Sequence, residues 1–113
     1  TTTPSGRHKI LDGYPVKVCE LLSNLKGVTY AQRCSVTSPL NINKTKKAIR
    51  KAFQCQRDKL GFSLVEILSP CPTNWKMNPI ESCKWIDNVM SKEFPLGVFK
   101  DNTAPAHKEA EAV

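Results

Sequence analysis

The residues of this chain best suited to chemistry are its five cysteines, because a thiolate can act as a nucleophile, a redox group or a metal ligand. They stand at Cys19, Cys34, Cys55, Cys71 and Cys83, and no two form the short CxxC pair typical of structural zinc sites. Their odd number and the lack of a signal-peptide pattern argue against a disulfide framework. The pattern favours free thiols in a reducing compartment, and we expect a cytoplasmic protein.

Cys71 differs from the other cysteines in its local sequence, SPCPTNW over residues 69–75. A proline on each side makes the backbone stiff there, so that neither strand nor helix is expected to continue through it. The segment follows an expected buried strand, and open α/β sheets bind ligands beyond the carboxyl ends of their strands. Spacing alone leaves two interpretations of Cys71 open. It is either a functional thiol, as a cluster ligand or a catalytic group, or an inert thiol buried beside Trp75.

Other motifs that would encode an active site are absent from the sequence. No GxGxxG, GxxxxGK[ST] or GxSxG pattern occurs, which excludes a phosphate-binding glycine loop and a nucleophile elbow of the usual kind. The two histidines lie near opposite ends of the chain and belong to no metal-binding pattern. The carboxylates are isolated, and Glu66 interrupts an apolar run, where a buried acid would need a partner or an altered protonation state. We therefore expect no catalytic residue within this chain.

The formal net charge of +7 raises the question of an anionic partner. Lysines and arginines are densest over residues 44–59, a pattern typical of the solvated face of an amphipathic helix. We expect no aromatic residues to interleave with this basic run, as stacking platforms would require, which argues against nucleic-acid binding. No apolar stretch approaches the roughly 20 residues of a membrane-spanning helix, so we expect no membrane partner.

The hydrophobic pattern alternates between helical and strand periods. The expected elements are an extended connecting segment over residues 1–13, a helix from Tyr14 to Gly27, a strand over 28–36, a helix from Asn41 or Asn43 to about Leu60, a strand over 62–69, a loop over 70–75, a helix from Pro79 to Phe94, a short strand over 96–99 and a mobile tail over 102–113. This order predicts an α/β fold with parallel strands and helical crossovers. Two convincing strands make a thin sheet, which indicates part of a larger fold.

Several segments resemble the β subunit of 2-oxoacid:ferredoxin oxidoreductases. GFSLVEILSPCPTNWKMNPIESCKWI and FPLGVFKD are similar to the C-terminal part of that subunit, especially in enzymes acting on 2-oxoglutarate or branched-chain 2-oxoacids. TTTPSGR, GYPVKVCELL and KTKKAIRKAFQCQ agree with the same family. The resemblance covers nearly all of residues 1–101, and CPTNW with its flanks is its most specific part.

The resemblance implies that residues 14–101 form the C-terminal α/β portion of a thiamine-diphosphate-binding domain, a partial thiamine-diphosphate-binding fold. The enzyme would decarboxylate a 2-oxoacid oxidatively, form an acyl-CoA from coenzyme A and pass the electrons to ferredoxin. Implied cofactors of the complete subunit are thiamine diphosphate, Mg²⁺ and a 4Fe-4S cluster. Implied partners are the N-terminal part of the β subunit, the α subunit and ferredoxin.

The resemblance also implies a role for Cys71. In cluster-bearing β subunits the cluster is held by an early CxxC pair, one middle cysteine and the cysteine of a late PCPT-type motif, which Cys71 matches. The other four cysteines match no ligand position and are expected to be packing residues. The GDG-type motif that holds diphosphate and Mg²⁺ is absent, so we expect this chain alone to be inactive. Two alternatives stay open, a separate non-catalytic assembly module of a split subunit and a basic nucleic-acid-binding domain.

Overall fold

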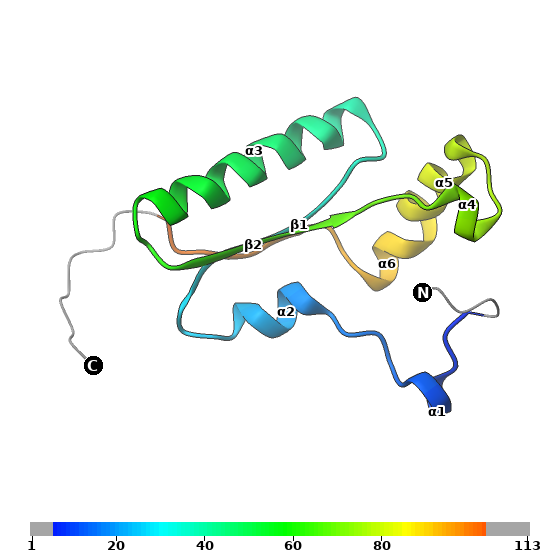
Figure 1. Ribbon diagram of the computed structural model, residues 1–113, viewed down its shortest axis with the longest axis horizontal. Coiled ribbons are helices and arrows are strands. Elements are labelled where there is room, and N and C mark those ends of the chain that lie inside the picture. Colours follow the sequence, from blue (N-terminus) through cyan, green and yellow to red (C-terminus); the bar gives the residue numbers. More distant parts are fainter. Residues whose placement is uncertain (1–5, 104–113) are drawn as a thin grey trace.

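The computed structural model describes residues 6–103, which form a three-stranded sheet with helices on both faces (Figure 1). The strands are β1 (Val28–Ser35), β2 (Phe62–Leu68) and β3 (Gly97–Asp101), in the spatial order β2-β1-β3. β1 and β2 are parallel, and α3 (Pro39–Arg57) connects them across one face of the sheet. The predicted α/β class and its helical crossover are confirmed.

β3 corrects the expectation of an all-parallel sheet, because it runs antiparallel to β1. The chain between β2 and β3 contains α4 (Pro72–Trp75), α5 (Pro79–Trp85), the π-helical turn η1 (Ile86–Met90) and α6 (Ser91–Glu93). These helices stay at the end of the sheet where β1 and β2 terminate (Figure 1). The chain therefore re-enters the sheet from that end and must run back along β1.

The core lies between β1 and α3. Tyr30 and Cys34 of β1 are buried against Ala48 and Cys55 of α3. Ser38 is the N-cap of α3, since its side chain accepts a hydrogen bond from the Asn41 amide at 3.2 Å. The helix thus begins earlier than the predicted Asn41 or Asn43, because Ser38 supplies the cap and a proline follows at the first helical position.

The turn between α3 and β2 requires glycine at position 61. Helix α3 ends at Arg57, three residues before the predicted Leu60, and Lys59 adopts a left-handed φ of 53°. Gly61 has a φ of 140°, and a Cβ there would lie 2.3 Å from Thr29 Oγ1. A side chain at this position would therefore clash with β1.

Helix α2 (Val18–Ser23) covers the other face of the sheet and is shorter than the predicted 14–27. The Ser23 hydroxyl and the Asn24 amide group both donate to the Glu20 carbonyl oxygen, which ends the helix before Gly27. A further helical turn, α1 (Lys9–Asp12), lies within the segment that was expected to be extended. The Asp12 carboxylate accepts a hydrogen bond from the His8 amide at 2.7 Å and stabilises that turn.

The second half of the chain follows the predicted order of elements, with two local differences. The predicted helix from Pro79 to Phe94 is present, but η1 interrupts its regular winding. Pro72 begins a helical turn inside the predicted loop, because a proline at the first helical position needs no amide donor. Apart from residues 102 and 103, the predicted tail over 102–113 lies outside the described residues. Within residues 6–103, no helix has the length and apolarity needed to cross a membrane.

Candidate functional site

Cys71 lies just beyond the carboxyl end of β2, where the sequence pattern places it. β2 ends at Leu68, and Cys71 is the N-cap of α4. The Trp75 amide donates to the Cys71 carbonyl oxygen, and the Met77 amide donates to the Pro72 carbonyl oxygen, both at 3.0 Å. These bonds and the flanking prolines restrict the turn to one backbone conformation. Cys71 is exposed, so a stiff turn presents this cysteine to solvent.

Two tryptophans pack against each other next to this turn. The ring centroids of Trp75 and Trp85 lie 4.9 Å apart with their planes at 53°, and both residues are half-buried. Their contact holds α4 against α5. The interpretation of Cys71 as a thiol buried beside Trp75 is wrong, because Trp75 packs on Trp85 while Cys71 stays exposed.

The other cysteines are placed differently. Cys19, Cys34 and Cys55 are buried and Cys83 is half-buried, and none is in a disulfide. Burial raises the pKa of Cys19 to about 12, with a further contribution from its hydrogen bond to Glu66. Burial also raises the pKa of Cys34 and that of Cys55. These three thiols stay protonated and unreactive at neutral pH, which fits the packing role expected for them.

A buried arginine at the centre of the sheet is the strongest polar feature of the fold, and sequence reasoning missed it. Arg33 of β1 is 1% exposed. Its Nη1 and Nη2 donate to the two carboxylate oxygens of Glu20 at 2.9 and 2.6 Å, and its Nε donates to Glu66 at 3.0 Å. Nη1 also donates to the Pro95 carbonyl oxygen at 3.1 Å. One guanidinium therefore ties together α2, β2 and the segment that leads into β3.

Aromatic rings complete the surroundings of this guanidinium. The Arg33 guanidinium carbon lies 5.4 Å from the ring centroid of Phe94 and 4.9 Å from that of Phe99. Hydrogen bonding to Arg33 lowers the pKa of Glu20, and the same bond raises the pKa of Arg33. The cluster thus holds a fully buried guanidinium in ion pairs with two half-buried carboxylates.

The expectation that Glu66 needs a partner is confirmed. Arg33 and Glu66 are directly paired in the register of the parallel strands β1 and β2. The signal that could have identified the pair is an arginine in one apolar strand and a glutamate in the next. Because Glu66 precedes Cys71 by five residues on the same strand and loop, this ion pair fixes the strand from which Cys71 emerges.

Comparison with known proteins gives a specific relationship. The chain is similar to ketoisovalerate oxidoreductase subunit VorA. It is 40% identical to VorA of Methanothermobacter thermautotrophicus and 39% identical to VorA of Methanothermobacter marburgensis, in each case over 103 residues. These residues are 91% of this chain but 22% of each relative, so the chain spans about a fifth of the length of the curated relatives it matches. No protein-family model matches the chain, and no solved structure matches it significantly.

The similarity to VorA supports the resemblance to a subunit of a 2-oxoacid oxidoreductase, and the structure limits what the described residues can hold. Within residues 6–103, no three or more side chains of His, Cys, Asp or Glu gather into a group that could hold a metal ion. Cys71 is the one exposed cysteine among residues 6–103, so these residues would contribute one exposed thiolate to a site made of four. The donor set fits a single cluster ligand and no complete metal site.

A cavity of about 230 Å³ opens at the carboxyl end of β1, the other place where ligands of α/β folds bind. Its lining residues are Gln32, Arg33, Cys34, Ser35, Asn41, Lys44, Leu96 and Gly97. None of these lining residues is an acid that could hold Mg²⁺, and the guanidinium of Arg33 is already paired with two carboxylates. The lining of this cavity therefore does not by itself fit the diphosphate-bound Mg²⁺ of a thiamine-diphosphate site.

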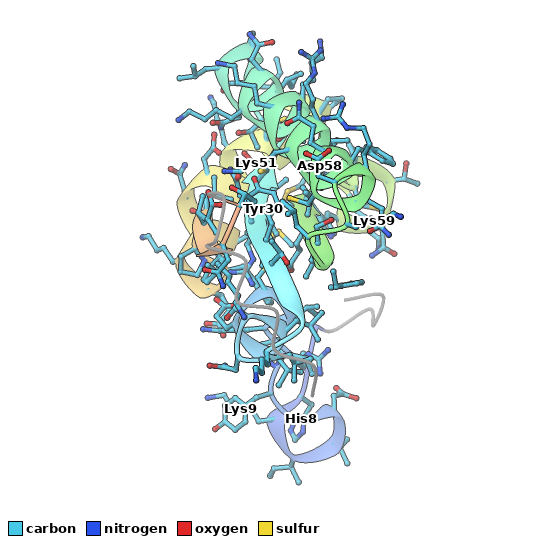
Figure 2. All side chains as sticks on the ribbon, turned by 90° about the vertical axis from the view of Figure 1, so that its left-hand side faces the viewer. His8, Lys9, Tyr30, Lys51, Asp58 and Lys59 are labelled. Atoms are coloured by element: carbon cyan, nitrogen blue, oxygen red, sulfur yellow. The ribbon has the colours of Figure 1, made fainter. Side chains whose placement is uncertain are left out.

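The basic run over residues 44–59 lies largely on the exposed faces of α3, as expected for a solvated helix. Its exposed members within α3 are Lys44, Lys46, Lys47, Arg50 and Arg57, and Lys59 is exposed just beyond the end of the helix. Lys51 is different, because it pairs with Asp101 of β3 and lies 5.1 Å from the ring centroid of Tyr30 (Figure 2). The expectation that no aromatic residue interrupts the basic run is wrong for Phe53, which is exposed on the same helix.

Proposed function

We propose that this chain forms the C-terminal portion of the β subunit of a 2-oxoacid:ferredoxin oxidoreductase that acts on branched-chain 2-oxoacids in the cytoplasm. The observation that carries the proposal is the similarity to VorA over 91% of the chain. Ketoisovalerate, named for those relatives, is a branched-chain 2-oxoacid, which favours this substrate class over 2-oxoglutarate. The exposed Cys71 in its Pro-Cys-Pro turn supports the assignment to the β subunit.

In this proposal Cys71 supplies one thiolate to a 4Fe-4S cluster, and the other three ligands come from outside the described residues. The bound cluster would supply one-electron transfer towards ferredoxin. The contribution of this chain is geometric, because Pro70, Pro72 and the hydrogen bonds of α4 orient the ligand before the cluster binds. The Arg33 ion pairs keep β2, and with it the start of the turn, at a fixed position in the sheet.

The remaining parts of the reaction are assigned to other parts of the enzyme. Thiamine diphosphate and Mg²⁺ would be held by the N-terminal part of the β subunit, since the lining of the described cavity lacks acidic ligands. The α subunit and ferredoxin would be partners of the assembled enzyme. This chain alone is therefore expected to bind neither cofactor completely and to be inactive.

The test is the substitution Cys71→Ser in a chimeric subunit, in which this chain replaces the matching 103-residue stretch of M. thermautotrophicus VorA. After assembly with the other subunits, we expect the variant to lose the visible absorption of the cluster and the reduction of ferredoxin. Binding of thiamine diphosphate should persist, because the variant changes only a cluster ligand. Cys83→Ser, at a half-buried cysteine in the neighbouring helix α5, is the matched control and should keep the spectrum. An unchanged spectrum in Cys71→Ser would contradict the ligand role.

A further inference from the structure

The outer edge of β2 has no neighbouring strand among residues 6–103, although the strand lies in the middle of the chain. β2 pairs with β1 on one side and leaves its backbone groups unpaired on the other. An open edge of this kind invites pairing with a further strand, and natural proteins usually block or cover it. Phe62 at the start of β2 is 53% exposed, so the edge is not protected by charged side chains at that point.

A groove of about 390 Å³ follows this edge on the side of α3. Its lining residues are Ile49, Ala52, Phe53 and Gln56 of α3 with Ser63 and Val65 of β2. Phe53 is 71% exposed, which is unusual for the largest apolar side chain of an amphipathic helix. The groove therefore has the shape and the apolar character of a place where another element packs.

Basic side chains border the groove on its outer side. Lys46, Arg50 and Arg57 lie around Ile49 and Phe53 on the flank of α3. In the described part of the chain Arg57 pairs with Asp58, and neither Lys46 nor Arg50 takes part in an ion pair. A complementary surface would be apolar at its centre and acidic at its border.

We propose that this surface, made of the β2 edge, Ile49, Phe53, Lys46 and Arg50, binds a β-strand and its adjacent helix from the part of the oxidoreductase subunit that this chain does not contain. The strand would extend the sheet beside β2, and the helix would cover Phe53 and present acidic residues to Lys46 and Arg50. The proposal rests on the relationship to VorA, because about four-fifths of each relative lies outside the matched stretch. Sheets contain about five to six strands on average, so a three-stranded sheet with an open edge at β2 has room for a further strand.

Two other occupants are less compatible with the surface. A second copy related by a two-fold axis would place the basic border of one α3 against that of the other, and like charges at an interface are unfavourable. A nucleic acid would need stacking side chains interleaved with basic ones, whereas Phe53 is the one aromatic residue among those lining the groove and the flank of α3. Phe62, the other exposed aromatic residue of the surface, starts a strand that carries no lysine or arginine.

Hydrogen exchange of the backbone amides tests the proposal in the isolated chain and in the chimeric subunit. We expect amides of residues 62–68 to exchange at least about tenfold more slowly in the chimera, because the added strand protects the open edge. Phe53→Asp should remove this protection in the chimera while leaving the circular dichroism of the isolated chain unchanged. Leu40→Asp is the matched control, since Leu40 is 65% exposed on the same helix, about 20 Å from Phe53 along its axis.

Equal exchange of β2 in the chain and in the chimera would overturn the proposal. A dimer of the isolated chain that Phe53→Asp dissociates, with β2 unprotected in the chimera, would assign the surface to a second copy instead. Salt-sensitive DNA binding that Phe53→Asp abolishes, again with β2 unprotected, would assign it to nucleic acid. The readout is independent of the cluster, so a protected β2 together with an unchanged spectrum in Cys71→Ser would support this docking and reject the cluster ligand.

Discussion

At the scale of single residues, burial distinguishes Cys71 from three buried cysteines, while Cys83 is half-buried. Cys19, Cys34 and Cys55 occupy the space of small apolar side chains, and their raised pKa values keep them protonated. Cys71 is exposed on a stiff turn at the end of the sheet, where another group can reach its thiol. The local sequence around Cys71 was sufficient to single it out, because prolines on both sides restrict the backbone whatever the tertiary contacts are.

The ion-pair partners of Arg33 could not be predicted from the sequence. In the linear sequence it is one arginine in a strand, and its environment depends on the register between β1 and β2, which places it opposite Glu66. The need of Glu66 for a partner followed from the apolar run around it. The identity of that partner followed only from the pairing of two strands more than thirty positions apart.

Arg33→Met tests the energetic weight of this ion-pair cluster. The variant leaves two half-buried carboxylates, Glu20 and Glu66, without their common cation, and we expect a loss in the free energy of unfolding of at most about 3–5 kcal/mol, the value for a broken fully buried pair. Urea denaturation of the 113-residue chain measures this change. Arg57→Met is the control, because Arg57 forms an exposed pair with Asp58 and should cost less than about 1 kcal/mol. Equal losses in the two variants would show that the buried cluster contributes no more than a surface pair.

At the scale of secondary structure, the elements with long and regular patterns were predicted well. β1, β2 and α3 appear with small shifts in their ends, because alternation and helical periodicity over many residues outweigh local detail. The ends depend on individual hydrogen bonds, such as those from Ser23 and Asn24 that terminate α2. The direction of β3 depends on the path of the preceding helices through space. The hydrophobic pattern within the strand contains no information about that path.

The start of α3 gives a direct test of one such end. The sequence pattern favoured Asn41 or Asn43 as the cap, whereas the structure assigns this role to Ser38. Ser38→Ala should lower the free energy of unfolding by about 1 kcal/mol, because the Asn41 amide loses its acceptor. Asn43→Ala, at an exposed position within the helix, should change it by less than about 0.5 kcal/mol. The opposite ranking in urea denaturation would restore the cap predicted from the sequence.

At the scale of the whole molecule, the shape is that of a slab and not of a closed globule. Its radius of gyration is 16.7 Å and its extents are 52 × 37 × 19 Å. A compact domain of this length has a radius of gyration of about 13 Å. Several large apolar side chains are exposed, among them Ile10, Tyr14, Phe53 and Ile80. That the chain is part of a larger fold stays a prediction, and the chain spans about a fifth of the length of each relative it matches.

The dependence of stability on pH follows from groups distributed over this slab. Hydrogen bonds to Arg33 and Lys51 lower the pKa of Glu20 and that of Asp101 from ordinary values of 4.5 and 3.8. Each carboxylate therefore contributes stability above its ordinary value, and that contribution is lost as the pH falls through the lowered pKa of the folded state. On the alkaline side, unfolded thiols lose their protons near pH 9.0 while Cys19 keeps its proton up to about 12. Stability therefore also falls as the pH rises above 9.0.

We therefore expect a plateau in the free energy of unfolding between about pH 5 and about pH 9, with a decline on both sides that urea denaturation across this range would measure. Glu20→Gln should flatten the acid limb, because an amide neither gains nor loses a proton there. Cys19→Ala should make the alkaline limb less steep, and Cys34 and Cys55, whose pKa values are also raised, should account for the slope that remains. The two limbs have separate causes, so each variant serves as the control for the other. An acid limb that keeps its slope in Glu20→Gln would mean that the pairing with Arg33 contributes no proton-linked stability.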